Sequence, residues 1–134
     1  MKIILNKCYG GFSPSHAAYL LYAEKKGIPL YMYEQRVDGN FKKINKDKRY
    51  SVVHYFTKDF GDYAVEKEID WDYNLYLTYE YRTDPVLIEV VEELGKKASN
   101  FYSNLVVVDI PDGMDYVIDD YDGVETLHEK VRTW

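Results

Sequence analysis

The sequence predicts an α+β fold: a mixed, mostly antiparallel sheet of about five or six strands, with two main helices and a short C-terminal helix. Three observations lead to this prediction. Apolar runs of strand length are spread along the chain, two segments carry apolar residues at helical spacing, and turn residues separate them. The chain has 134 residues without an internal repeat or a linker-like segment, so we expect one domain over residues 1–134.

The first half of the chain is predicted to begin with a strand, a loop and a helix. Residues 2–6 form an apolar strand, and Ser13-Pro14-Ser15 offers an N-cap hydroxyl with proline at the first helical position. We expect this helix to end at Gly27, after two lysines that suit the negative end of its dipole. The strands predicted next are 29–35, 51–56 and 74–81, and a solvated basic loop is predicted at 42–49.

The second half contains the clearest helix of the sequence. Asp84 can cap it, and Pro85 suits its first turn. Its apolar residues at helical spacing are Leu87, Val90, Val91, Leu94, Ala98 and Phe101. Residues 105–110 predict a buried strand and residues 116–119 a partner strand. After Asp122-Gly123, the apolar positions Val124, Leu127 and Val131 suit a last short helix that ends near Trp134.

Charge is divided unevenly between the two halves of the chain. Residues 1–60 hold 11 Lys and Arg against 5 Asp and Glu, and residues 61–134 hold 6 against 18. The halves therefore carry +6 and −12 within a net charge of −6, and they should attract each other. This attraction acts either within one fold or between subunits. We favour attraction within one fold, and a homo-oligomer is the alternative.

The sequence predicts a cytoplasmic protein with no membrane partner. No apolar run approaches the roughly 18 residues that span a bilayer, and the N-terminal apolar segment stops at Asn6, too early for a signal peptide. The single cysteine, Cys8, excludes an internal disulfide.

No metal or cofactor is expected. The three histidines, at positions 16, 54 and 128, are solitary, which argues against structural zinc. In the acidic tract 109–129, Asp120, Asp122, Gly123 and Glu129 match EF-hand positions 3, 5, 6 and 12, but Ile118 stands at the first ligand position. A solvated acidic face is the better interpretation.

Nucleic acid is not favoured as a partner. The basic run 42–49 could contact phosphates, but no aromatic residues interleave with it and the chain as a whole is acidic. No nucleic-acid recognition motif is evident.

The segment Asn6-Lys7-Cys8-Tyr9-Gly10-Gly11-Phe12 is the first candidate binding site. It joins a strand to a helix N-terminus, where free backbone N–H groups and the charge of Lys7 suit a phosphate or carboxylate. Neither the dinucleotide nor the P-loop signature is present, and a plain tight turn is the simpler interpretation of the two glycines. Cys8 with His16 or His54 would make a nucleophile, although a buried, inert cysteine is the simpler interpretation.

Further candidate ligand contacts are polar and aromatic. Arginine forks and a terminal indole suit phosphates and planar bases, although ion pairing with the abundant carboxylates is the preferred interpretation for the arginines. The chain also has fifteen tyrosines, whose rings suit stacking on planar ligands. The complete set of predicted ligand-binding residues is Lys7, Tyr9, Gly10, Gly11, Ser13, Arg82, Arg132 and Trp134.

Three segments resemble a family of small, uncharacterised bacteriophage and prophage proteins. They are Asn6-Lys7-Cys8-Tyr9-Gly10-Gly11-Phe12-Ser13, Arg82-Thr83-Asp84-Pro85 with Val90-Val91-Glu92-Glu93-Leu94-Gly95, and Tyr121-Asp122-Gly123-Val124-Glu125 with Arg132-Thr133-Trp134. The resemblance covers about a third of the chain. The chain departs from the family at Ser99-Asn100-Phe101, where the family tends to have Asn and Arg, and at Val131, where it has His.

The resemblance implies a setting rather than a reaction. Small phage accessory proteins often bind a host component, including nucleotide-derived immune signals. We therefore expect a non-enzymatic phage accessory protein, with an anti-defence role, that sequesters a small anionic, nucleotide-like ligand in the host cytoplasm. Two alternatives stay open: a protein-interaction module that inhibits a host enzyme through its acidic face, and a small cysteine-dependent hydrolase or transferase.

Overall fold

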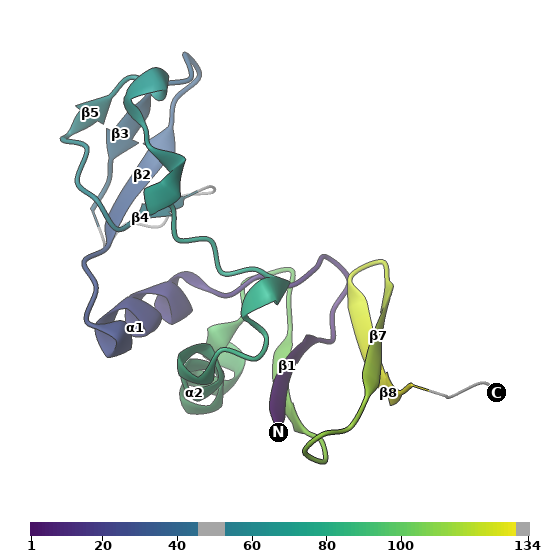
Figure 1. Ribbon diagram of the computed structural model, residues 1–134. Coiled ribbons are helices and arrows are strands. Elements are labelled where there is room, and N and C mark those ends of the chain that lie inside the picture. Colours follow the sequence, from purple (N-terminus) through teal and green to yellow (C-terminus); the bar gives the residue numbers. More distant parts are fainter. Residues whose placement is uncertain (46–52, 131–134) are drawn as a thin grey trace. The chain divides into compact units, whose positions relative to one another are not determined.

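The computed structural model of the chain describes residues 1–45 and 53–130. It divides into two compact units, which Figure 1 shows. The terminal unit comprises Met1–Lys26 and Leu77–Trp134, and the inserted unit comprises Gly27–Tyr76. The prediction of one domain over residues 1–134 stays a prediction.

The α+β class is confirmed. The α-helices are α1 (His16–Lys26) and α2 (Pro85–Leu94), and the 3₁₀ helices are η1 (Glu66–Glu68), η2 (Trp71–Tyr73), η3 (Tyr79–Tyr81) and η4 (Gly95–Ala98). The strands are β1 (Lys2–Asn6), β2 (Tyr31–Gln35), β3 (Phe41–Lys43), β4 (His54–Phe56), β5 (Tyr63–Ala64), β6 (Leu105–Asp109), β7 (Tyr116–Tyr121) and β8 (Val124–Glu129).

The strands within the described residues form three small antiparallel sheets, so the prediction of a single sheet is wrong. Their strand orders are β1–β6, β4–β2–β3–β5 and β7–β8. Tight turns at Asp38-Gly39 and Asp122-Gly123 return the chain directly onto the strand that it has just left, and this favours local hairpins. Of the basic loop predicted at 42–49, Lys42 and Lys43 belong to β3, and residues 46–49 lie outside the described residues.

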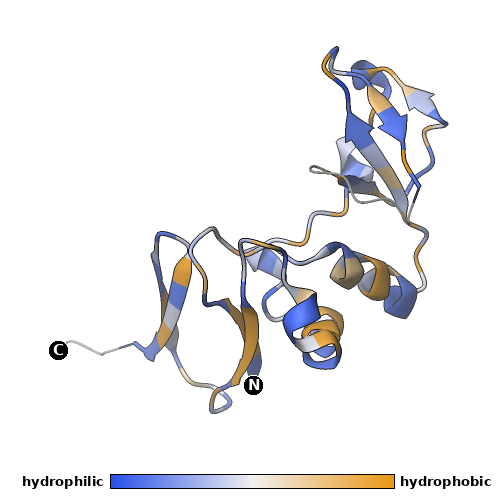
Figure 2. Cartoon of the chain, turned by 180° about the vertical axis from the view of Figure 1, so that it is seen from behind, coloured by the Kyte–Doolittle hydropathy of each residue, from blue (hydrophilic) through white to orange (hydrophobic). Residues whose placement is uncertain are grey.

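Both faces of the β1–β6 ribbon contribute to the core of the terminal unit. Ile3 pairs with Val108 and Leu5 with Val106, so these four side chains share one face. They pack with apolar residues of the β7–β8 hairpin and its approach, namely Ile110, Met114, Tyr116, Ile118 and Leu127. Ile4 belongs to the opposite face and is fully buried, and α2 packs against both strands. Figure 2 shows the hydrophobic character of β1.

Ion pairs in the terminal unit join the basic first half of the chain to the acidic second half. Lys2 Nζ lies 2.8 Å from Glu92, and Lys25 Nζ lies 2.8 Å from both Glu89 and Glu93. Hydrogen bonds to these carboxylates raise the pKa of both lysines. The pairs are largely exposed to water, so we expect them to orient α1 and α2 more than to stabilise them.

The two helices begin at different kinds of cap. Asp84 accepts hydrogen bonds from the N–H groups of Val86 (2.9 Å) and Leu87 (3.1 Å), and Pro85 opens α2 as predicted. The predicted start of α1 is wrong by two residues: Ser15 Oγ accepts from the N–H of Ala18 (3.1 Å), and Pro14 lies before the helix in a bridge to Ser99. Because Ser15 supplies the capping oxygen, the helix begins after it.

The sequence predicted that the helix continues to Phe101, but the α-helix ends at Leu94. Gly95 has a φ of 58°, which ends α2, and η4 follows it. Phe101 lies in the loop beyond η4 and is 93% exposed. Its apolar side chain therefore contributes nothing to the core.

The predicted C-terminal helix is wrong, because residues 124–129 form strand β8. Asp122 and Gly123 have φ angles of 52° and 92°, as a two-residue hairpin turn requires. The turn brings Ile118 opposite Leu127, and both side chains reach the core. Val131, the third apolar position of the predicted helix, lies outside the described residues.

The predicted strand 74–81 is also wrong, although the alternation that suggested it is present. Leu75 and Leu77 are buried and Tyr76 between them is exposed. Only Asn74 bridges to another strand, at Phe56. The Thr78 hydroxyl accepts from the N–H of Glu80 (3.3 Å), which favours the turn of η3 over an extended strand.

The inserted unit is built around an aromatic core. Tyr33, Phe41 and Phe56 are fully buried and come from three neighbouring strands. The ring of Phe56 lies edge-on to Tyr33 (5.7 Å between centroids) and to Phe41 (6.3 Å). The hydroxyl of Tyr33 donates to the carbonyl of Gly61 (2.8 Å), so the core leaves this polar group satisfied. Among the described helices of the chain, none is both long and apolar enough to cross a membrane.

Acid is expected to destabilise the inserted unit through His54. Its ring lies edge-on to Phe41 (5.5 Å) and Trp71 (5.7 Å), and burial lowers the pKa of His54 below its usual 6.5. The unfolded chain then binds more protons than the folded one. The stability that His54 contributes is therefore full above about pH 6.5 and is lost as the pH falls through the folded-state pKa.

Thermal unfolding followed by tryptophan fluorescence between about pH 8 and pH 5 checks this expectation. The melting temperature should fall toward pH 5, and His54→Phe should reduce the fall. Asp59 does not confuse the result, because Lys43 lowers the pKa of Asp59 below its usual 3.8. An equal acid loss in His54→Phe would contradict the role of His54.

Candidate functional site

Three segments that are far apart in the sequence meet at Asn6, where β1 ends. The Asn6 side chain is fully buried. Its amide donates to the carbonyls of Cys8 (2.8 Å) and Gly123 (2.6 Å), and its Oδ1 accepts from the N–H of Asn104 (2.9 Å). One side chain thus ties together residues 6–13, 99–104 and 121–125, which we call the loop junction.

A buried ion pair closes the edge of β1 beside the loop junction. Arg82 Nη2 lies 2.7 Å from Glu125 Oε2 and Nη1 lies 3.2 Å from Oε1, and the two side chains are only 12% and 6% exposed. Arg82 also bonds Ile4 twice, through its carbonyl (2.9 Å from Ile4 N) and through Nη1 (3.2 Å from Ile4 O). Glu125 Oε1 accepts from the N–H of Asn6 (2.8 Å). The pair therefore satisfies backbone groups that a neighbouring strand would otherwise bond.

The helix η3 and two aromatic rings position Arg82. Arg82 follows η3 directly, and both its N–H and its Nε donate to the carbonyl of Tyr79 (3.1 Å each). The guanidinium carbon lies 5.5 Å from the ring centre of Phe12 and 5.8 Å from that of Tyr79. These contacts hold the guanidinium toward Glu125 and leave little freedom for it to reach a ligand.

Glycines allow the segments of the loop junction to touch through their backbones. A Cβ on Gly123 would lie 2.6 Å from the nitrogens of both Gly10 and Gly11, and a Cβ on Gly10 would lie 2.5 Å from the carbonyl oxygen of Tyr102. The β7–β8 turn therefore covers the Gly10 and Gly11 nitrogens, which the sequence suggested for binding an anion. The glycines are needed for close packing as well as for their positive φ angles.

The loop before β6 is fixed by hydrogen bonds to Ser13. The carbonyl of Ser13 accepts from the N–H of Asn100 (3.2 Å) and from the hydroxyl of Ser103, and the Ser13 hydroxyl accepts from the Asn100 amide. Asn100 Oδ1 in turn accepts from the N–H of Tyr102 (2.9 Å). Phe101 and Tyr102 are thus carried on a closed turn rather than on a free loop.

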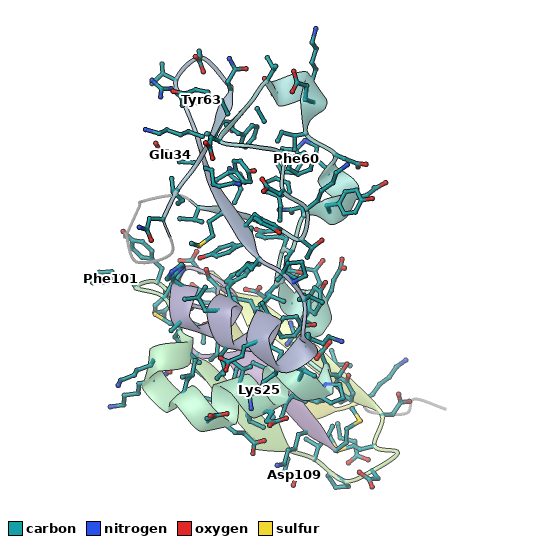
Figure 3. All side chains as sticks on the ribbon, turned by 90° about the vertical axis from the view of Figure 1, so that its left-hand side faces the viewer. Lys25, Glu34, Phe60, Tyr63, Phe101 and Asp109 are labelled. Atoms are coloured by element: carbon teal, nitrogen blue, oxygen red, sulfur yellow. The ribbon has the colours of Figure 1, made fainter. Side chains whose placement is uncertain are left out.

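Exposed aromatic rings surround the loop junction. They are Tyr9, Phe101, Tyr102 and Tyr121, which come from all three segments. Figure 3 shows Phe101 standing away from the ribbon. Lys7 is also exposed: its Nζ donates to the carbonyl of Glu125 (2.7 Å), and no carboxylate pairs with it within residues 1–45 and 53–130. Rings beside an available ammonium group suit a ligand that is planar and anionic.

The structure brings six of the eight predicted ligand-binding residues to the loop junction or its edge. Lys7 and Tyr9 have exposed side chains, whereas Ser13 and Arg82 use their polar groups within the protein. Gly10 and Gly11 form the backbone contacts with Gly123. Arg132 and Trp134 lie outside the described residues.

Sequence reasoning missed the residues that assemble the loop junction. Asn6 opened the first candidate binding segment but was given no role in it, Glu125 belonged to the acidic tract, and Phe101 was assigned to a helix. Only Asn6 gave a local signal, because an amide at the inner end of an apolar strand needs hydrogen-bond partners. The partner of Glu125 is Arg82, which is 43 residues away, and no local pattern indicates such a pair.

The other candidate chemistries occupy different surroundings. Asp119, Asp120 and Asp122 are exposed on the β7–β8 hairpin, whereas Glu125 of the same acidic tract is buried against Arg82. The Cys8 thiol is half-buried and lies 3.6 Å from the carbonyl of Tyr9. Within the described part of the chain, no group of three or more His, Cys, Asp or Glu side chains is placed to hold a metal ion.

Comparisons with protein-family models, with curated proteins and with solved structures find no significant match to this chain.

Proposed function

We propose that this protein is a non-enzymatic phage accessory protein that binds and sequesters a small anionic, nucleotide-like ligand at the loop junction, in the host cytoplasm. The observation that carries the proposal is the position of Tyr9 and Tyr102. The close backbone contact between Gly10 and Tyr102 brings the segments of these two exposed tyrosines together. Lys7 supplies a cation on the loop that carries Tyr9. An aromatic ring stacks on a base, and an ammonium group attracts a phosphate.

The proposal divides the predicted residues into two roles. Lys7 and Tyr9 contact the ligand, together with Tyr102. Arg82 and Ser13 act as positioning residues, because their hydrogen bonds already hold β1 and the Asn100–Ser103 turn. The site is therefore preorganised, which reduces the entropy lost on binding. An anti-defence role would follow if the ligand is a signal made by the host.

Binding of a nucleotide panel tests the proposal. The purified chain is titrated with mono- and cyclic dinucleotides and ADP-ribose, by calorimetry and thermal shift. We expect at least one of them to bind, and we expect Tyr9→Ala to weaken it at least about fivefold, which corresponds to a stacking contribution of about 1 kcal/mol. Lys7→Gln should weaken binding more at low salt than at high salt, because the contribution of the lysine is electrostatic.

Two matched variants serve as controls. Tyr76→Ala and Lys67→Gln remove an exposed tyrosine and an exposed lysine from the inserted unit, which contributes no residue to the loop junction. They should leave the affinity unchanged. No binding across the panel, or equal losses in the control variants, would contradict the proposal.

A further inference from the structure

Two more lysines flank the aromatic residues of the loop junction. Lys96 and Lys97 belong to η4, which directly precedes the Asn100–Ser103 turn. Both are exposed, and in the described parts of the chain neither lies within ion-pair distance of a carboxylate. Lys2 and Lys25, in contrast, contact Glu92, Glu89 and Glu93. The chain therefore leaves available cations beside Phe101 although it carries more acidic than basic residues.

Phe101 is unusual because it combines full exposure with a fixed backbone. It is 93% exposed, and its ring centre lies 5.5 Å from that of Tyr102, which is 66% exposed. The turn that carries it is closed by Asn100 Oδ1, by Ser103 Oγ and by the contacts with Ser13. Covering an exposed apolar ring with a partner lowers the free energy of the complex. Because the turn that carries the ring is already ordered, binding loses little conformational entropy there.

The composition of this part of the chain fits a strand of nucleotides. Lys96 and Lys97 precede Phe101 and Tyr102 along the chain, and the backbone contact between Tyr102 and Gly10 joins this segment to the loop of Lys7 and Tyr9. Platforms of this composition bind single strands, because unpaired bases stack on rings while cations follow the phosphates. A duplex keeps its bases stacked inside and offers no such faces to the rings.

We infer that the binding surface extends from the loop junction to η4 and takes a short single-stranded oligonucleotide, with Phe101 as an additional stacking position and Lys96 and Lys97 at the phosphates. This inference rests on the proposed function for its first stacking position, at Tyr9 and Tyr102. The basic run 42–49, on which the sequence-based assessment of nucleic-acid binding depended, is not part of this surface.

The test compares ligand lengths on the full chain. Labelled thymidylate and oligothymidylates of about two, four and eight nucleotides are titrated by fluorescence anisotropy, with a long mixed-sequence duplex as competitor. We expect the affinity to rise at least about tenfold from the monomer to the longer strands. Phe101→Ala should weaken only the longer strands, by about fivefold or more, and Phe101→Tyr should restore them.

Salt dependence tests the lysines separately. The Lys96→Gln/Lys97→Gln variant should lower the slope of log affinity against log salt for the longer strands by about 1.4, the value for two phosphate contacts on a single strand. All these positions are exposed, so an unchanged melting temperature confirms that each variant is folded. Lys67→Gln is the matched control and should leave the slope unchanged.

The outcomes separate this inference from the proposed function. If mononucleotides bind through Tyr9 but longer strands bind no tighter, the inference is wrong and the proposed function stands. If duplex competes as well as single strand, Phe101 is not a stacking position and the inference is wrong. If no nucleotide of any length binds, both the inference and the proposed function are wrong.

Discussion

Replacing Glu125 by alanine is expected to destabilise the terminal unit by about 3–5 kcal/mol, the cost of leaving a buried charge without its partner. The Arg82 guanidinium is 12% exposed and would lose both carboxylate oxygens, at 2.7 Å and 3.2 Å. The N–H of Asn6 would lose its acceptor as well. Urea unfolding followed by far-UV circular dichroism measures the effect as a lower midpoint.

A double-mutant cycle shows whether the loss belongs to the pair. Arg82→Met alone should also be strongly destabilising, because it leaves the Glu125 carboxylate buried. Arg82→Met with Glu125→Leu removes both charges, and its loss should be several kcal/mol less than the sum of the two single losses. It should not restore full stability, since Ile4 O and Asn6 N still lose their partners. Additive losses would contradict a coupled pair.

Gly123→Ala is expected to destabilise the chain by about 2–6 kcal/mol, through two separate effects. At a φ of 92° an alanine is strained by about 1–3 kcal/mol. Its Cβ would also lie 2.6 Å from the backbone nitrogens of Gly10 and Gly11, which cannot move aside as a side chain can. Crowding of this kind adds about 1–3 kcal/mol, or it separates the β7–β8 turn from the loop.

Gly113→Ala is the matched control for Gly123→Ala. Gly113 has a φ of 77°, so alanine there is strained in the same way, but no atom lies within 4 Å of its Cβ position. Urea unfolding of both variants gives the crowding effect as their difference. Equal losses in the two variants would mean that the β7–β8 turn does not press on the Gly10-Gly11 turn.

The parts of the fold that the sequence predicted correctly are those determined by residues close together in the sequence. Helix α2 begins at Asp84 and Pro85 as expected, because an N-cap and a proline act within one turn of the chain. Residues 124–129 were wrongly assigned to a helix from three apolar positions. The stronger signal was Asp122-Gly123 between runs of β-branched and polar residues, since this dipeptide adopts the positive φ angles of a tight hairpin.

The candidate site was less predictable because distant residues assemble it. Lys7, Tyr9 and Gly10 were recognised from one continuous segment, and they do lie at the loop junction. Arg82 was named as a ligand contact with ion pairing as the preferred interpretation, and it bonds Glu125 and the backbone of β1. Whether Arg82 can contact a ligand depends on whether the chain brings Glu125, 43 residues away, against it. The local sequence around neither residue indicates this pairing.

The proposed function and the further inference both require that the loop junction is one binding surface formed by three segments. Titrating the ¹⁵N-labelled chain with the tightest ligand of the nucleotide panel, and following each backbone amide by NMR, tests it most directly. We expect the shifted resonances to belong to residues 7–12, 100–103 and 121–123, with those of the inserted unit unchanged. Binding that shifts only residues 27–45 and 53–76, or only the exposed face of the β7–β8 hairpin, would contradict the claim.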